Sequence, residues 1–143
     1  MLTARTPAAA TGTATNRRLK TVATIAAALT GLLAFAGAIG VVGGGADFGK
    51  QVEERLPWES PVLAGIALAL VVGVPTTLAA FTLWRLMPQA AVTTLIAGVM
   101  LVAWIAVQIA VIREFNPLQV VFGIVGLLLI ATGWHFARSD SPD

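Results

Sequence analysis

The chain has 143 residues, of which 57% are hydrophobic and only 11% are charged, and its formal net charge is +2. A soluble domain carries roughly 25% charged residues and must cover its outside with polar groups, so this composition excludes an ordinary soluble domain. The absence of cysteine excludes disulfides, thiolate metal sites and cysteine nucleophiles. The basic residues flank apolar segments and do not form one continuous face, so we expect no nucleic-acid partner.

Four apolar segments lack Lys, Arg, Asp and Glu, and each exceeds the roughly 20 residues that cross a bilayer as a helix. They do not alternate in the manner of a membrane β-barrel, and only helices and closed barrels satisfy their backbone groups in lipid. The sequence therefore predicts an all-α fold, a four-helix transmembrane bundle with short loops. The predicted spans are residues 21–45, 60–84, 87–112 and 116–137.

Residues 1–20 are rich in Ala and Thr and contain no aromatic side chain. Such a segment buries too little apolar area to offset the entropy of ordering, so we expect a disordered N-terminal tail. The tail ends in the basic cluster Arg17, Arg18 and Lys20. A cleavable signal peptide is an alternative interpretation, with cleavage after the Ala34–Ala36 triplet. An uncut first span is favoured because cleavage would leave an apolar, glycine-rich terminus.

The distribution of Lys and Arg predicts how the bundle is oriented. Cytoplasmic ends of spans carry the excess of basic residues, and the cluster at the first span usually dominates. We therefore expect a multi-pass plasma-membrane protein with both termini cytoplasmic, ending in a short tail over residues 138–143. The predicted inner set is Arg5, Arg17, Arg18, Lys20, Arg85 and Arg138, and the outer set is Lys50, Arg55 and Arg113.

The first outer loop, residues 47–58, has Phe48, Val52 and Leu56 at steps of four, which predicts a short amphipathic helix on the membrane surface. Pro57 ends this helix. The loop is either a connector or a docking site for a partner on the outer face. Its adjacent carboxylates, Glu53 and Glu54, point in different directions on a helix and do not predict a metal site.

Small residues at four-residue spacing allow helices to approach closely in lipid. Two such ladders are present, and we predict that they pack inside the bundle, with a self-association face as the alternative. The ladders are Ala36, Gly40 and Gly44 in the first span, and Gly65, Ala69 and Gly73 in the second. Pro75 follows the second ladder and predicts a helix kink, with nearby threonines able to satisfy the freed carbonyls.

The stretch IREFNPLQ separates the third and fourth spans. Arg113 and Glu114 would be costly inside the bilayer, and Asn116–Pro117 is a turn signal, so we predict an outer turn here. Gln108 and Gln119 each lie five residues from Arg113 or Glu114, which places them at equal depth. We expect these two amides to form a polar contact between the helices.

No group of residues in the sequence predicts catalysis or a cofactor. His135 is the only histidine, so it cannot build a metal site without other ligands, and no serine has a base nearby. The length and four-span layout are similar to the small multidrug resistance family of proton-coupled exporters. That family carries a membrane-embedded Glu in its first helix, and residues 21–46 contain no carboxylate, so the resemblance does not extend to the coupling residue.

In composition and layout the whole chain resembles small, Ala-, Gly- and Val-rich four-span proteins of actinobacterial plasma membranes. We expect a non-catalytic protein in contact with the lipid bilayer, acting as an accessory or scaffolding subunit that packs against a membrane-protein partner. The alternative is a small carrier or channel that works as a homo-oligomer. A carrier needs a polar path, which only six residues could supply: Thr76, Thr77, Thr93, Thr94, Gln108 and Gln119.

Overall fold

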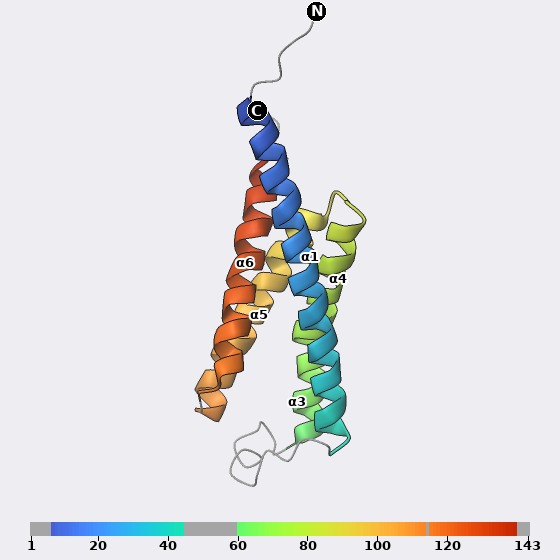
Figure 1. Cartoon of the computed structure of the whole chain (residues 1–143). Helices are drawn as coiled ribbons and strands as arrows, with labels where there is room; N and C mark the ends of the chain where they lie inside the picture. The colour runs from blue at the N-terminus through green and yellow to red at the C-terminus, as the bar shows by residue number, and fades with distance from the viewer. Residues whose placement is uncertain (1–6, 45–59, 114, 140–143) are drawn as a thin grey trace, which may run out of the picture.

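The structure, a computed structural model, describes residues 7–44, 60–113 and 115–139. Within these ranges the chain contains no β-strand, and four helical segments are long and apolar enough to cross a membrane, which confirms the predicted fold class. Figure 1 shows these segments lying alongside one another. The elements are α1 (Pro7–Val42), α3 (Pro61–Leu68), the π-helical segment η2 (Ala69–Gly73), α4 (Val74–Trp84), α5 (Ala90–Ile112) and α6 (Pro117–Ser139).

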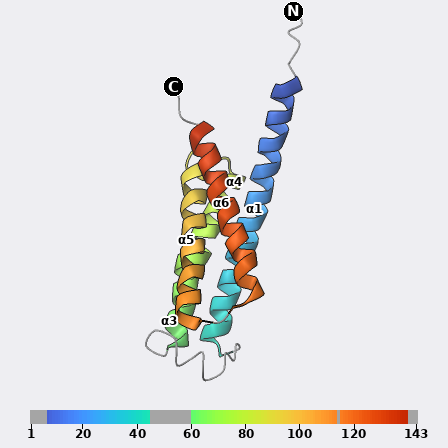
Figure 2. The same ribbon diagram turned by 90° about the vertical axis from the view of Figure 1, so that its left-hand side faces the viewer.

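Helix α1 begins at Pro7, which corrects the expected disordered tail over residues 7–20. Residues 1–6 lie outside the described ranges. Ala is the best helix former, and threonine hydroxyls here donate to carbonyls four residues earlier, as Thr15 does to Thr11 at 3.0 Å. Asn16 also contacts His135 of α6, with 3.0 Å between Oδ1 and Nε2. The first turns of α1 extend past the rest of the bundle (Figures 1 and 2).

The second span consists of α3, η2 and α4, and its ends match the predicted residues 60–84 closely. In η2 the backbone hydrogen bonds span five residues instead of four, and the Val74 N–H donates to the Ala69 carbonyl. Pro75 follows directly and has no N–H to donate. The Thr76 hydroxyl donates to the Val72 carbonyl at 2.6 Å, one residue after Pro75. A kink was predicted at Pro75, and the structure has the π-helical segment η2 directly before α4, the helix that contains this proline.

The third span begins at Ala90, three residues later than predicted. Leu86 adopts a left-handed backbone conformation with φ of 53°, and the Met87 N–H donates to the Thr82 carbonyl at 3.0 Å. This geometry ends α4, and Pro88 lies in the turn that follows. The Thr82 and Thr93 hydroxyls then join α4 to α5 across the turn, 2.6 Å apart.

Helices α5 and α6 form a hairpin in which the two backbones lie in close contact. A Cβ atom built at Gly98 would lie 2.7 Å from the Gly126 carbonyl oxygen, and one at Gly133 would lie 2.6 Å from the Leu95 nitrogen. Both distances are shorter than real Cβ contacts. Gly126 and Gly133 lie a heptad apart on α6, and Gly98 is their counterpart on α5. Helix α1 packs on the other side of the bundle against α3, η2 and α4.

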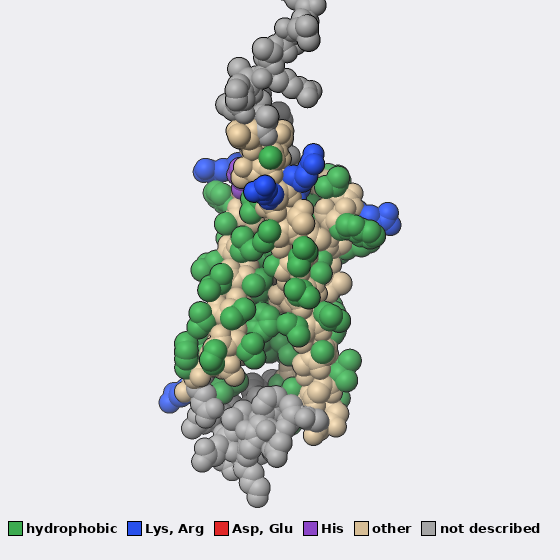
Figure 3. Space-filling view, in the orientation of Figure 1, with side chains coloured by type: hydrophobic (Ala, Val, Ile, Leu, Met, Phe, Trp, Pro, Cys, Tyr) green, Lys and Arg blue, Asp and Glu red, His purple; other side chains and the backbone are tan. Residues whose placement is uncertain are grey.

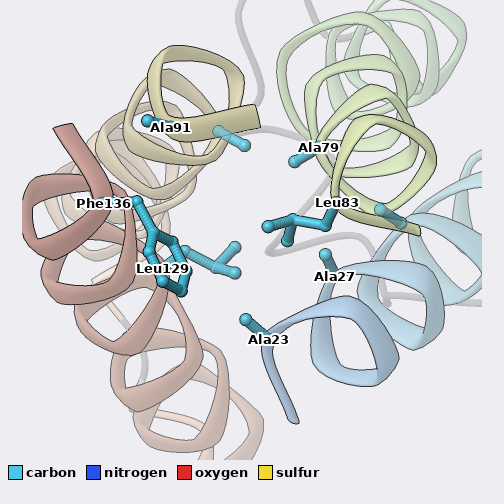
Figure 4. Close-up of a cluster of buried hydrophobic side chains, with 9 residues drawn as sticks. Ala23, Ala27, Ala79, Leu83, Ala91, Leu129 and Phe136 are labelled. Atoms are coloured by element: carbon cyan, nitrogen blue, oxygen red, sulfur yellow. The ribbon is translucent and has the colours of Figure 1, made fainter. Parts of the chain in front are cut away.

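Two clusters of buried side chains form the core, and they differ in side-chain size. The first is built mainly from alanines, with Leu83, Leu129 and Phe136 among them, and lies near the α4–α5 turn (Figure 4). The second contains Ala34, Val72, Leu101 and Ile105, with Trp104 and Phe122 packed against it. Large apolar side chains also cover much of the outside, as in Ile39 at 73% exposure, which suits helices surrounded by lipid.

Candidate functional site

The most distinctive concave feature is a groove of about 390 Å³ between two pairs of helices. One wall comes from α1, α3 and η2, and the other from α5 and α6. Figure 3 shows the hollow in the half of the bundle away from the basic cluster, with hydrophobic side chains at its base. Its lining is mostly apolar and includes Leu33, Leu68, Leu101, Ile105 and Phe122.

Polar groups line the groove only near the α5–α6 turn, apart from Thr30 on α1. They are the side chains of Gln108, Asn116 and Gln119. Gln119 Oε1 accepts a hydrogen bond from the Asn116 backbone N–H at 3.2 Å. The sequence placed Gln108 and Gln119 at equal depth, and both residues line this groove. No hydrogen bond joins their side chains within the described structure, which therefore lacks the predicted polar contact. The Gln119 amide oxygen instead satisfies the first turn of its own helix.

Trp104 contributes one wall of the groove and packs against the second core cluster. The side chain is half-buried, so it both fills the core and lines the groove. The indole Nε1 is buried and has no hydrogen-bond partner in the described part of the chain.

The α5–α6 turn has the predicted chemistry. Arg113 ends α5 in a left-handed conformation with φ of 55°, and its N–H donates to the Ile109 carbonyl at 3.1 Å. Asn116 Oδ1 accepts from the Leu118 N–H at 2.9 Å, which caps the start of α6, and Pro117 is the first residue of that helix. Glu114, the fourth predicted turn residue, lies outside the described residues, as does the predicted amphipathic loop 47–58.

The two predicted packing ladders have different surroundings. The second ladder, Gly65, Ala69 and Gly73, lies on the side of its span that meets α1. A Cβ at Gly65 would lie 2.8 Å from a Val42 methyl, and one at Gly73 would lie 3.0 Å from the Phe35 ring. Small residues are therefore needed at both glycine positions.

The first ladder faces away from the other described helices. Ala36 is exposed, and a Cβ at Gly40 would meet no atom of residues 7–44, 60–113 or 115–139 within 4 Å. Gly44 has φ of +69° just past the end of α1, where it terminates the helix. The prediction that this ladder packs inside the bundle is therefore wrong. Helix α1 uses another face, on which Ala27, Ala34 and Ala38 are buried.

Basic residues gather at one end of the bundle, where α1, α4 and α6 present Arg17, Arg18, Lys20, Arg85 and Arg138 (Figure 3). Several lie over aromatic rings: Lys20 Nζ is 4.9 Å from the centre of Phe136, and the Arg138 guanidinium is 5.2 Å from Trp134. Arg113 is the only cation at the opposite end among the described residues.

Within the described residues, no three His, Cys, Asp or Glu side chains are grouped so as to hold a metal ion. All seven acidic residues of the sequence lie outside those ranges, so the expectation of no metal and no catalysis stays a prediction. No protein family, curated protein or solved structure matches the chain.

Proposed function

We propose that this protein is a non-catalytic accessory subunit of the plasma membrane, which packs against a helix of a membrane-protein partner. The docking surface is the outward face of α1 around Ala36 and Gly40. The observation that carries the proposal is the open space at Gly40. Glycine inside a helix costs about 0.8–1.0 kcal/mol relative to alanine, and a Cβ at Gly40 would meet no atom of the described residues within 4 Å. A partner helix that approaches α1 closely gives this glycine a packing role.

The neighbouring glycines support this argument by contrast. Gly31, Gly65 and Gly73 lie where a Cβ would meet another helix at 3.1 Å or less, so their small size is already explained within the chain. Gly40 lies near Ile39, which is 73% exposed, and Ala36, which is also exposed. A small-residue depression bordered by large apolar side chains suits the close approach of a second helix in lipid.

A small oligomeric carrier or channel is the second candidate, and the groove is the observation that favours it. However, the six polar residues that a carrier could use do not all line the groove. Gln108 and Gln119 line the groove, whereas Thr76, Thr77, Thr93 and Thr94 do not. The Thr76 hydroxyl is bound to its own helix, and the Thr93 hydroxyl is bound to Thr82. This separation of the polar groups counts against a continuous polar path.

Purification from native membranes in mild detergent, followed by mass spectrometry of the intact complex, tests the proposal. We expect a stoichiometric partner that is lost in Gly40→Leu and retained in Ala131→Leu, since Ala131 is an exposed small residue on α6. Retention of the partner in Gly40→Leu would contradict a docking role for this face. A homo-oligomer that conducts solute into liposomes would instead favour the carrier.

We also infer that both termini are cytoplasmic, since the basic cluster lies at the end of the bundle where α1 begins and α6 ends. The natural chain has no cysteine, so single cysteines report topology without background. In intact cells, a membrane-impermeant maleimide should label Asn116→Cys and should reach Gln89→Cys only after lysis. The reverse pattern would show that the orientation is inverted.

A further inference from the structure

We propose that the groove between the two helix pairs is a binding site for one membrane phospholipid. An acyl chain lies against the apolar walls, the ester groups lie at Gln108 and Gln119, and the phosphate lies at the α5–α6 turn beside Arg113. This site is separate from the docking face in the proposed function, because neither Ala36 nor Gly40 lines the groove.

The bilayer around the groove favours a lipid chain as its occupant. The groove is an open hollow of about 390 Å³ with mostly apolar walls, and it lies among helices apolar enough to be surrounded by lipid. A hydrocarbon chain is much thinner than an α-helix, which is about 10 Å wide, and the surrounding bilayer supplies such chains. The deeper wall residues Leu68, Val72 and Leu101 offer it only apolar contacts.

The order of groups along the groove matches the order of groups in a phospholipid. Arg113 is exposed on the turn, between the lining residues Ile112 and Phe115, at the level where headgroups lie. Gln108 lies four residues before Ile112, about 6 Å deeper along the helix. An amide there can donate to an ester carbonyl, and an Arg guanidinium binds a phosphate oxygen well. Below this level the walls are apolar apart from Thr30.

Trp104 provides a direct readout because its ring lines the groove. The other tryptophans, Trp58, Trp84 and Trp134, are replaced by Phe, so that fluorescence comes from Trp104 alone. The detergent-solubilised full chain is titrated with phosphatidylglycerol brominated in its acyl chains, which quenches fluorescence on contact. Brominated diacylglycerol, which has no phosphate, is titrated in parallel.

We expect saturable quenching, with the phospholipid binding at least about tenfold more tightly than the diacylglycerol because of its charged hydrogen bond. Arg113→Gln should remove this difference, whereas Arg85→Gln, at the other end of the bundle, should preserve it. Gln108→Leu with Gln119→Leu should raise the half-saturation concentration of both lipids about tenfold. Gln89→Leu, outside the groove, should have no effect. Gln108, Gln119 and Arg113 are exposed or half-buried, and monodisperse elution checks that each variant is folded.

Three results would overturn the proposal. Quenching that rises in proportion to lipid without saturating would indicate ordinary annular contact. Saturable quenching that is unchanged in the Gln108, Gln119 and Arg113 variants would indicate nonspecific hydrocarbon binding. Absent quenching together with a dimer in native mass spectrometry would indicate that a second copy of the chain covers the groove.

Discussion

Replacing Gly133 by alanine tests the close backbone contact of the α5–α6 hairpin. The added methyl group would lie 2.6 Å from the Leu95 nitrogen, 2.8 Å from the Ala91 oxygen and 2.9 Å from the Leu95 Cα. All three atoms belong to the backbone, so no flexible side chain can move aside. The two helices must separate by several tenths of an ångström over their whole contact, because a packed helix moves as a unit.

Gly123→Ala provides the matched control on the same helix. A Cβ at Gly123 meets only the Ile105 Cδ1 atom at 4.0 Å, which is an ordinary contact. Both variants gain the same helix propensity of about 0.8–1.0 kcal/mol, so this contribution cancels in the comparison. Overpacking costs about 1–3 kcal/mol. Gly133→Ala should therefore be less stable than Gly123→Ala by about 1–3 kcal/mol.

The free energy of unfolding can be measured by titrating sodium dodecyl sulfate into mixed micelles and following far-ultraviolet circular dichroism. Gly98→Ala should behave like Gly133→Ala, since its Cβ would lie 2.7 Å from two backbone atoms of α6. Equal stability of the Gly133 and Gly123 variants, within about 0.5 kcal/mol, would refute the close contact.

Two further predictions concern threonines in the second and third spans. The Thr82 and Thr93 hydroxyls lie 2.6 Å apart. A double-mutant cycle of valine substitutions should give a coupling energy of about 0.6 kcal/mol and at most about 1.7 kcal/mol. Zero coupling would show that the pair does not interact. Thr76→Val should destabilise the protein by about 0.5–1.5 kcal/mol in the same unfolding assay, because the buried hydroxyl and its hydrogen bond to the Val72 carbonyl are lost. Thr77→Val, at an exposed position, should change stability by less than about 0.5 kcal/mol, and equal effects of the two would contradict the argument.

The number of spans and most of their ends could be predicted because lipid imposes a strict rule. Long uncharged segments must be helical, and charges must lie near their ends. The turn at Arg113 and Asn116–Pro117 follows from this rule together with local turn chemistry. A kink at Pro75 was predicted because proline removes a donor wherever it occurs in a helix, but the π-helical segment before α4 was not.

The packing faces could not be predicted to the same degree, and α1 shows the reason. Small residues occur around its whole circumference, so spacing alone cannot separate the buried Ala27, Ala34 and Ala38 from the exposed Ala36 and Gly40. Which face of α1 is buried depends on the surfaces of the helices that pack against it. Helical structure over residues 7–20 was not predicted for a related reason, because the contact of Asn16 with α6 joins residues far apart in the chain.

The groove itself follows from a gradient in side-chain size along the bundle. Near the basic end, Ala23, Ala27, Ala79 and Ala91 allow the helix pairs to meet closely, because a methyl group holds helices apart very little (Figure 4).

Toward the α5–α6 turn, the corresponding layer contains Leu101, Trp104, Ile105 and Phe122. These larger side chains pack along the walls and do not meet across the whole interval, which leaves about 390 Å³ between the pairs. Close packing is the main force that joins helices in lipid, so a space that the described residues leave open there favours the entry of hydrocarbon, as the proposed lipid site requires. The same residues that hold the helix pairs apart therefore also form the apolar walls of the proposed lipid site.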